Sequence, residues 1–414
     1  MEKRALYSPL IQKPPDSRLA LVVVIPAFDE PHLQKSLEAL LRCDLPEGVA
    51  VEIIVVINDA QSSPIDLKDR QQQQQMVLSH WAESINVAKR QFFLLHLSNL
   101  ADKQAGVGLA RKIGMDEAVR RLEAVENPEG VIACFDADTN CDPNYLQEVH
   151  RLFSTHLKAQ ACSIYYEHPL SGTDYPPAIY EAITAYELHL RYFLQAKRLA
   201  GFPYAYETIG SAMAVRCKAY QQQGGMNRRK AGEDFYFLNK FTQLGHFHEL
   251  TTTRILPSPR SSHRVPFGTG RAIGAILSGT QWTTYALQSF LDLQTFFQQI
   301  PSLYDLSPDH LNTWIKTLPQ AIATFLQSLP FEEKCAEIRQ NTSSSARFEQ
   351  RFYRWFDAFM LMKYVHFARD HFYPDVACRV AAIELLERAY GVRLPKADEK
   401  ELLLQFRELD RRKT

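Results

Sequence analysis

The sequence predicts an α/β fold in which an open, mostly parallel sheet is flanked by helices and followed by a region of helices alone. In the first part of the chain, short apolar runs rich in β-branched residues alternate with stretches that carry apolar residues at helical spacing. Beyond about residue 270 the remainder is aromatic-rich and has the pattern of amphipathic helices. Alternation of strands with helices is typical of parallel sheets, whose strands are joined by crossover helices.

The amino-terminal half alternates strictly between the two patterns. Buried strands are predicted for the apolar runs at residues 19–25, 51–57, 92–97 and 131–135. The stretches between them have helical spacing, and helices are predicted at residues 33–41, 67–89 and 106–122. This order predicts a sheet with helices on both of its faces.

The second half continues with less regular patterns. Strands are predicted at 161–167, 208–215 and 247–256, and helices at 144–156, 177–199, 235–244, 282–297 and 348–369. A loop rich in proline and serine ends near residue 270. We therefore expect a polar segment at 1–18, an α/β domain at 19–270 and a helical region at 271–414.

Composition excludes several classes of protein. The chain of 414 residues has 47 basic and 47 acidic residues, which argues against a nucleic-acid partner bound through a general positive field. No apolar run approaches the ~18 residues of a membrane-spanning helix, and residues 1–18 lack the apolar core of a secretory signal. Seven dispersed cysteines fit a reducing compartment. We expect a cytoplasmic protein.

The predicted strand at 131–135 is followed by two carboxylates, Asp136 and Asp138. Two like charges so close together repel each other unless a cation or a proton lies with them, and Mg²⁺-type ions prefer such oxygen ligands. The alternative is that Asp138 caps a helix that begins near Pro143. Polar residues at 26–30 and at Asn58–Asp59 also follow predicted strands, so three strand ends are expected to meet in one crevice.

These motifs, taken in order, resemble the nucleotide-sugar-dependent glycosyltransferases of the GT-A fold, family 2. The resemblance runs from about residue 21 to 270, and one position departs from it, because Lys112 stands where the family has asparagine. The matching segments are Ile25-Pro-Ala-Phe-Asp-Glu30, Val56-Ile-Asn-Asp59, Gly108-Leu-Ala-Arg-Lys-Ile-Gly114, Asp136-Ala-Asp138, Gly210-Ser-Ala-Met-Ala-Val-Arg216, Gly224-Gly-Met226 and Gly232-Glu-Asp234.

The resemblance implies roles for residues around the donor. Asp138 would bind a divalent metal, Mn²⁺ or Mg²⁺, and Asp136 would contact the donor ribose and the metal shell. Asp59 would bind the nucleobase. The remaining donor-binding residues would be Pro26, Ala27, Glu30, Arg111 and Arg264. The alternatives are that Asp59 is a turn or helix cap and that Arg111 lies on a solvated helix face.

The resemblance also implies how the acceptor reacts. Asp234 would be the general base, at the start of a helix whose dipole and free amides keep a carboxylate ionised. Its alternative role is that of a helix cap. Glu233 would orient the acceptor, and attack opposite the leaving group would invert the anomeric centre. His263 would complete the metal shell, with an exposed loop histidine as the alternative. Arg264 and the Gly268-Thr-Gly270 segment could form a lid over the diphosphate, because glycines supply hinge freedom.

The expected partners are a UDP- or GDP-sugar donor and a hydroxyl-bearing acceptor: a glycan, a lipid or a small molecule. Three other classes compete. A nucleotidyltransferase would have a Gly-x-Gly-x-Arg loop after the first strand, which is missing here. A retaining GT-A enzyme and a degenerate fold that only binds nucleotide or carbohydrate remain alternatives. The aromatic residues of the helical region are expected to be core, with an acceptor groove, an oligomer contact or a peripheral membrane contact as alternatives for a few.

Overall fold

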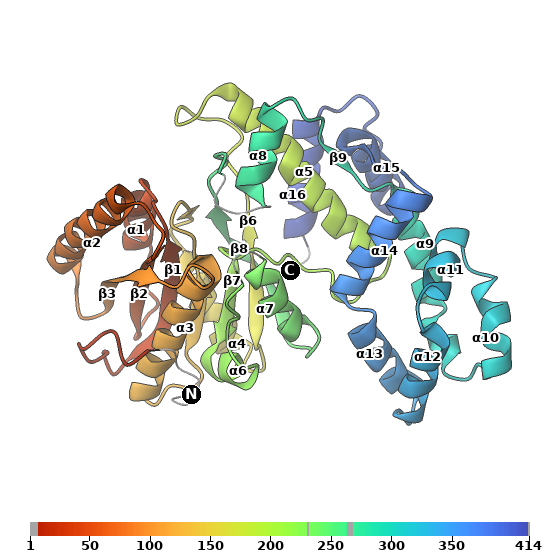
Figure 1. The fold of residues 1–414 in the computed structure, drawn as a ribbon, viewed down its shortest axis with the longest axis horizontal. Helices are drawn as coiled ribbons and strands as arrows, with labels where there is room; N and C mark the ends of the chain where they lie inside the picture. The colour runs from red at the N-terminus through yellow and green to blue at the C-terminus, as the bar shows by residue number, and fades with distance from the viewer. Residues whose placement is uncertain (1–6, 230–231, 263–267, 413–414) are drawn as a thin grey trace. The chain divides into compact units, whose positions relative to one another are not determined.

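The computed structural model describes residues 7–229, 232–262 and 268–412 (Figure 1). The chain divides into two compact units, which are described separately. The sheet unit comprises residues 1–175, 207–271 and 411–414, and the helical unit comprises residues 176–206 and 272–410.

The sheet unit is built on an eight-stranded sheet of order β3-β2-β1-β4-β7-β6-β8-β5. Its strands are β1 (Leu19–Ala27), β2 (Ala50–Ala60), β3 (Arg90–Leu100), β4 (Val131–Cys134), β5 (Asn140–Cys141), β6 (Ala161–Tyr166), β7 (Met213–Arg216) and β8 (Phe247–Leu256). The pairs β1–β2, β1–β4, β2–β3 and β6–β8 are parallel, whereas β4–β7, β6–β7 and β5–β8 are antiparallel. The expected α/β fold with a mostly parallel sheet is confirmed.

Strand β1 lies inside the sheet, between β2 and β4, and is buried on both faces. Residues 21–25 have no exposed surface, as expected for a β-branched run covered by helices on both sides. The helices of this unit are α1 (Leu33–Arg42), α2 (Ile65–Ile85), α3 (Val107–Ala124), α4 (Tyr145–Thr155), α6 (Cys217–Gln222) and α7 (Glu233–Thr242). In the red-to-orange part of Figure 1 the first three strands lie side by side.

Helix α3 approaches β1 closely because it carries a glycine at the contact. A Cβ atom on Gly114 would lie 2.4 Å from Val24 Cγ1, a distance that no side chain tolerates. The glycine therefore lets the helix backbone pack against the strand. This packing also fixes the position of Arg111, which lies one turn earlier on the same helix.

Two predicted elements of the sheet unit differ from the structure. The strand predicted at 208–215 is limited to 213–216, because the preceding residues form a turn in which the Ala212 N–H donates to the Ile209 carbonyl. The helix predicted at 67–89 ends at Ile85, because the chain turns back through Val87 and Arg90 to enter β3. The strand predicted at 247–256 is confirmed.

The described part of the helical unit consists of helices and a small strand pair. It contains α5 (Pro177–Leu199), α9 (Leu287–Gln298), the 3-10 helix η2 (Ile300–Leu303), α10 (Pro308–Ile315), α11 (Gln320–Gln327), α12 (Phe331–Gln340), α13 (Ser345–Trp355), α14 (Ala358–His371), α15 (Cys378–Tyr390) and most of α16 (Glu399–Arg411), with β9 (Thr283–Thr284) antiparallel to β10 (Val376–Ala377). Helix α8 (Thr269–Leu277) spans the division between the units.

Helix α5 lies within the predicted α/β domain of residues 19–270, but in the structure it is part of the helical unit. There it packs on α9 and α15 and forms buried ion pairs with α16. The Arg407 Nη2 atom lies 2.7 Å from Glu187 Oε2, and the Arg191 Nη1 atom lies 2.5 Å from Asp410 Oδ2. Charges of this kind are stable in a protein interior only when they are paired, so α5 and α16 hold each other in place.

Two further predictions fail in the helical unit. The helix predicted at 348–369 is interrupted after Trp355, because the Asp357 side chain caps a new helix by accepting hydrogen bonds from the Phe359 and Met360 N–H groups. The helix predicted at 282–297 begins only at Leu287, since Thr283 and Thr284 pair with β10. The aromatic residues Phe352 and Phe356 are fully buried, so the prediction that they are core is confirmed.

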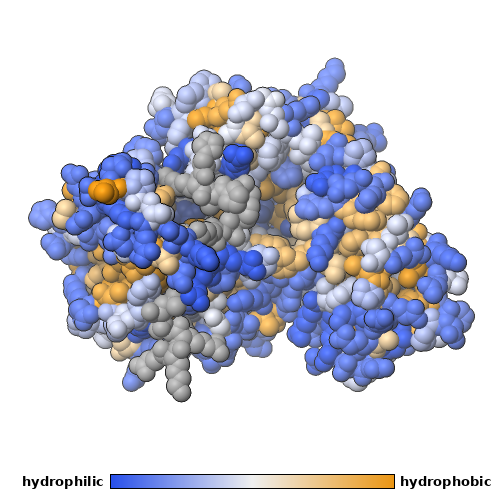
Figure 2. All heavy atoms as spheres, viewed as in Figure 1, coloured by the Kyte–Doolittle hydropathy of each residue, from blue (hydrophilic) through white to orange (hydrophobic). Residues whose placement is uncertain are grey.

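The described residues contain no helix with both the length and the apolar character needed to cross a bilayer. Figure 2 shows hydrophobic residues interspersed with hydrophilic ones on the visible face. All seven cysteines are buried and unpaired.

Candidate functional site

The ends of β1 and β4 lie together at the carboxyl edge of the sheet, as the sequence predicts. Both strands are parallel and adjacent, and each is followed by carboxylates: Glu30 after β1, and Asp136 and Asp138 after β4. The Arg260 guanidinium joins the two strand ends, because it forms ion pairs with both Glu30 and Asp138. The acidic residues therefore share one site.

Arg111 forms a second bridge, between the β4 end and the start of α7. Its side chain is only 2% exposed; Nη2 donates to Asp136 Oδ1 at 2.8 Å and Nη1 to Glu233 Oε1. Burial alone would lower the pKa of Arg111, but the carboxylates of Glu233 and Asp136 outweigh burial and raise it. The alternative of a solvated helix face is wrong. Arg111 holds two carboxylates of the site, and its predicted contact with the donor stays a prediction.

Gly210 packs directly against this arginine. A Cβ atom at Gly210 would lie 2.8 Å from Arg111 Nη2 and 3.1 Å from Cζ. The guanidinium cannot move aside at little cost, because two ion pairs hold it. The glycine of the predicted Gly210–Arg216 motif is thus needed for the close approach of backbone and arginine.

Gly210→Ala is therefore expected to destabilise the protein by roughly 1–3 kcal/mol through overpacking. Urea titration of the purified variant measures this loss in the free energy of unfolding. In an Arg111→Met background the clash is relieved, so the added cost of Gly210→Ala should fall by more than half. Equal costs in both backgrounds would show that Arg111 does not set the requirement for glycine.

Asp136 and Asp138 have the chemistry of a cation site. Their side chains are 39% and 26% exposed, and each has one oxygen in an ion pair, with Arg111 and Arg260 respectively. The other oxygen of each accepts no hydrogen bond from the described part of the chain. Loss of hydration raises the pKa of Asp136, Arg111 opposes this shift, and the charges of Asp138 and Glu233 add to it. Two solvent-accessible oxygens suit a hard divalent ion that keeps water and phosphate ligands.

Within residues 7–229, 232–262 and 268–412, no group of three histidine, cysteine or carboxylate side chains is arranged to hold a metal. Asp136 and Asp138 thus offer at most two protein ligands. His263 and Arg264, the predicted third ligand and the predicted lid residue, lie outside the described residues. The Ser262 N–H donates to the Gly270 carbonyl at 3.0 Å, so the described residues before and after this stretch are hydrogen-bonded to each other.

Asp234 lies in the first turn of α7, where the capping residue is Gly232 in the left-handed conformation. Its Oδ1 atom accepts a hydrogen bond from the Phe235 N–H at 2.8 Å. Burial and the neighbouring Glu233 raise its pKa to about 6, against the opposing effects of Arg111 and the Phe235 N–H, so the predicted ionised form is the main form only above that pH. A carboxyl group with such a pKa is matched to proton transfer near neutral pH.

Asp59 is placed differently from the other acidic residues. It has no exposed side-chain surface and accepts hydrogen bonds from three groups of β3: His96 Nε2 at 3.0 Å, the Ser98 hydroxyl at 2.9 Å and the Asn99 N–H at 2.9 Å. Although burial opposes the shift, these bonds lower the pKa of Asp59. Asp59 joins the ends of β2 and β3, and its nucleobase contact stays a prediction. Pro26 and Ala27 are buried within β1.

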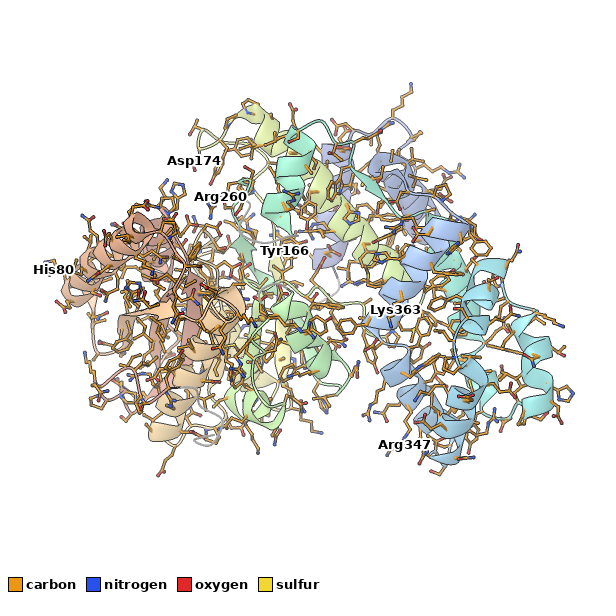
Figure 3. The ribbon with its side chains drawn as sticks, viewed as in Figure 1. His80, Tyr166, Asp174, Arg260, Arg347 and Lys363 are labelled. Carbon is orange, nitrogen blue, oxygen red and sulfur yellow. The ribbon has the colours of Figure 1, made fainter. Side chains whose placement is uncertain are left out.

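Arg260 is the residue that sequence reasoning missed. It follows β8, is 19% exposed and is labelled in Figure 3. The sequence signal was weak: Arg260 is one of two arginines in a loop rich in proline and serine, and it lies three residues before His263. Only the fold brings it to Glu30, 230 residues away in the sequence.

No protein-family model matches the chain, and no curated protein sequence matches it. Solved structures with a partial likeness include the crystal structure of S. aureus TarS residues 1–349 in complex with UDP, at 14% identity and a TM-score of 0.39, covering 82% of this chain and 92% of that one. A second structure of S. aureus TarS has the same identity and TM-score, covering 81% of this chain and 55% of that one. A likeness of this extent carries no conclusion about activity.

Proposed function

We propose that the chain is a glycosyltransferase that moves a sugar from a nucleotide-diphosphate sugar to a hydroxyl acceptor. One observation carries the proposal: Arg111 holds Asp136, at the end of β4, and Glu233, at the start of α7, on a single guanidinium. This bridge unites the predicted donor-side motif with the predicted acceptor-side motif. If the carboxylates at the end of β4 and at the start of α7 were only caps, they would not need to share a buried arginine.

On the donor side, Asp138 and Asp136 would hold a divalent metal, Mn²⁺ or Mg²⁺. The family resemblance implies His263 as a third ligand. When bound, the ion supplies positive charge that stabilises the departing diphosphate. Glu30, Pro26, Ala27 and Asp59 would line the nucleoside pocket. Arg111 would favour the ionised form of Asp136 against the effect of burial and would hold its orientation, because it donates to one of that residue's two oxygens.

On the acceptor side, Asp234 would be the general base. Its carboxylate takes the proton of the acceptor hydroxyl while that oxygen forms a bond to the anomeric carbon and the bond to the diphosphate breaks. Attack opposite the leaving group inverts the anomeric centre. A pKa of about 6 supports this role, since the group is ionised at neutral pH and still basic enough to accept a proton. Glu233 would orient the acceptor.

A screen of UDP- and GDP-sugars with and without Mn²⁺ tests the proposal. We expect one nucleotide class to raise the melting temperature in a metal-dependent way and to be slowly hydrolysed by the enzyme. The anomeric configuration of the product, read by NMR, separates inversion from retention. Binding without any turnover would favour a binding module, and absence of all nucleotide-sugar binding would refute the proposal.

A further inference from the structure

The positively charged side chain of Arg260 lies next to Asp138, the predicted metal ligand. Its Nε atom lies 2.9 Å from Asp138 Oδ2, and its Nη2 atom pairs with Glu30 Oε2. Glu30 is only 1% exposed, and its other oxygen accepts the His32 N–H at 3.0 Å. A buried carboxylate requires a partner, so the bond to Glu30 anchors the arginine, while the bond to the more exposed Asp138 is the weaker of the two.

A guanidinium bound to Asp138 opposes a metal ion at the same carboxylate. Two cations on one carboxylate repel each other, and the arginine already satisfies one of its oxygens. The negative charges of a diphosphate remove this conflict, because they offset the charge of the metal and are themselves good acceptors for a guanidinium. Arginine is well suited to such a change of partner, since its planar fork binds carboxylates and phosphates alike.

We propose that Arg260 is the counter-ion of the ligand-free site and that it exchanges Asp138 for the donor diphosphate when metal and donor bind together. The Nη2 atom stays on Glu30, and the Nε edge moves from the Asp138 carboxylate to a phosphate of the donor. The metal alone therefore binds weakly, and nucleotide and metal bind cooperatively. This inference rests on the proposed function and adds to it a residue that couples the two ligands.

The test is direct binding of Mn²⁺, followed by the paramagnetic resonance signal of the free ion, together with calorimetric binding of UDP and GDP in the presence of Mn²⁺. In Arg260→Gln we expect Mn²⁺ alone to bind roughly fivefold more tightly, because a partly exposed opposing charge is gone. The nucleoside diphosphate should bind roughly tenfold more weakly, because a charge-assisted contact is lost. The two effects have opposite signs, which a general loss of structure would not produce.

Arg254→Gln is the matched control. Arg254 also joins two carboxylates, with Nη2 3.0 Å from Asp142 and Nη1 2.8 Å from Glu167, and its side chain is 33% exposed. Its removal should leave both affinities unchanged. Arg260→Lys serves if the glutamine variant is poorly folded: it keeps the charge but offers a single nitrogen. It should bind Mn²⁺ as weakly as wild type and the diphosphate with an affinity between those of wild type and Arg260→Gln.

Unchanged Mn²⁺ affinity in Arg260→Gln, or unchanged diphosphate affinity, would overturn the exchange even if wild type binds both ligands. Failure of the proposed function is a separate result: wild type would then bind neither UDP, GDP nor any nucleotide sugar in the presence of Mn²⁺. That result would also overturn the exchange, since the arginine would have no second partner.

Discussion

Asp234→Asn is expected to lower the rate of sugar transfer by about 10²–10⁴-fold, while nucleotide binding in the presence of metal is retained. Asparagine has the same shape and keeps an oxygen to accept the Phe235 N–H, but it cannot take a proton from the acceptor. Steady-state transfer assays and calorimetric nucleotide binding measure the two effects. In wild type the rate should rise with pH up to about 6 and then level off, as Asp234 ionises.

The same substitution should make the protein more stable above pH 6. Burial raises the pKa of Asp234 from 3.8 to about 6, so the folded state binds its proton more tightly than the unfolded state does. The free energy of unfolding therefore falls as pH rises through this window, and above it the ionised carboxylate destabilises the fold. We expect Asp234→Asn to gain about 1–3 kcal/mol above pH 6 and nothing near pH 4.

Urea titrations of wild type and Asp234→Asn across this pH range measure whether the substitution raises or lowers the free energy of unfolding. A transfer rate within a factor of about three of wild type would remove Asp234 as the base. A variant that is less stable than wild type at pH 8 would show instead that the carboxylate is a structural cap.

Arg111→Met is expected to destabilise the sheet unit by about 3–5 kcal/mol and to abolish donor binding. The substitution leaves the buried Glu233 carboxylate, whose side chain is 5% exposed, without its charged partner. Asp136 loses its fixed orientation at the same time. Chemical denaturation and nucleotide binding by the folded fraction give the two readouts.

Arg121→Met provides the comparison for this prediction. Arg121 lies on the same helix, is 4% exposed and pairs with Glu52, which is 2% exposed, away from the acidic site. Its loss should destabilise the protein to a similar extent without affecting nucleotide binding. The double variant Arg111→Met/Glu233→Gln should recover part of the stability but not the binding. Nucleotide binding at wild-type affinity by Arg111→Met would contradict the role given to this arginine.

Periodicity predicted the sheet unit well because several of its strands are buried on both faces. Such strands have uninterrupted apolar runs, as in β1 and β2, and the runs leave little doubt about their type. The helical unit was predicted less well. The break at Asp357 depends on a local cap, and the pairing of Thr283–Thr284 with Val376–Ala377 depends on contacts between residues far apart in the chain. Neither the cap nor the strand pairing produces a periodic pattern of apolar residues in the sequence.

The candidate site was predictable where it consists of strand ends. Asp136 and Glu30 follow strands whose parallel order places them at one edge. The cations were harder to predict, because their partners are set by folding: Arg111 reaches Glu233 across 122 residues and Arg260 reaches Glu30 across 230. Burial likewise decides the raised pKa of Asp234, which the dipole of α7 alone predicts in the opposite direction.

We expect the Asp136–Asp138 carboxylates to form a metal-dependent site for a nucleotide sugar. Calorimetric titration of wild type and Asp138→Asn with UDP and GDP, each with Mn²⁺ and with a chelator, tests this site. We predict that wild type binds one of the two nucleotides at least tenfold more tightly with Mn²⁺ than with the chelator, and that Asp138→Asn loses this difference. Equal affinity in wild type and Asp138→Asn, or no binding of either nucleotide, would contradict this expectation.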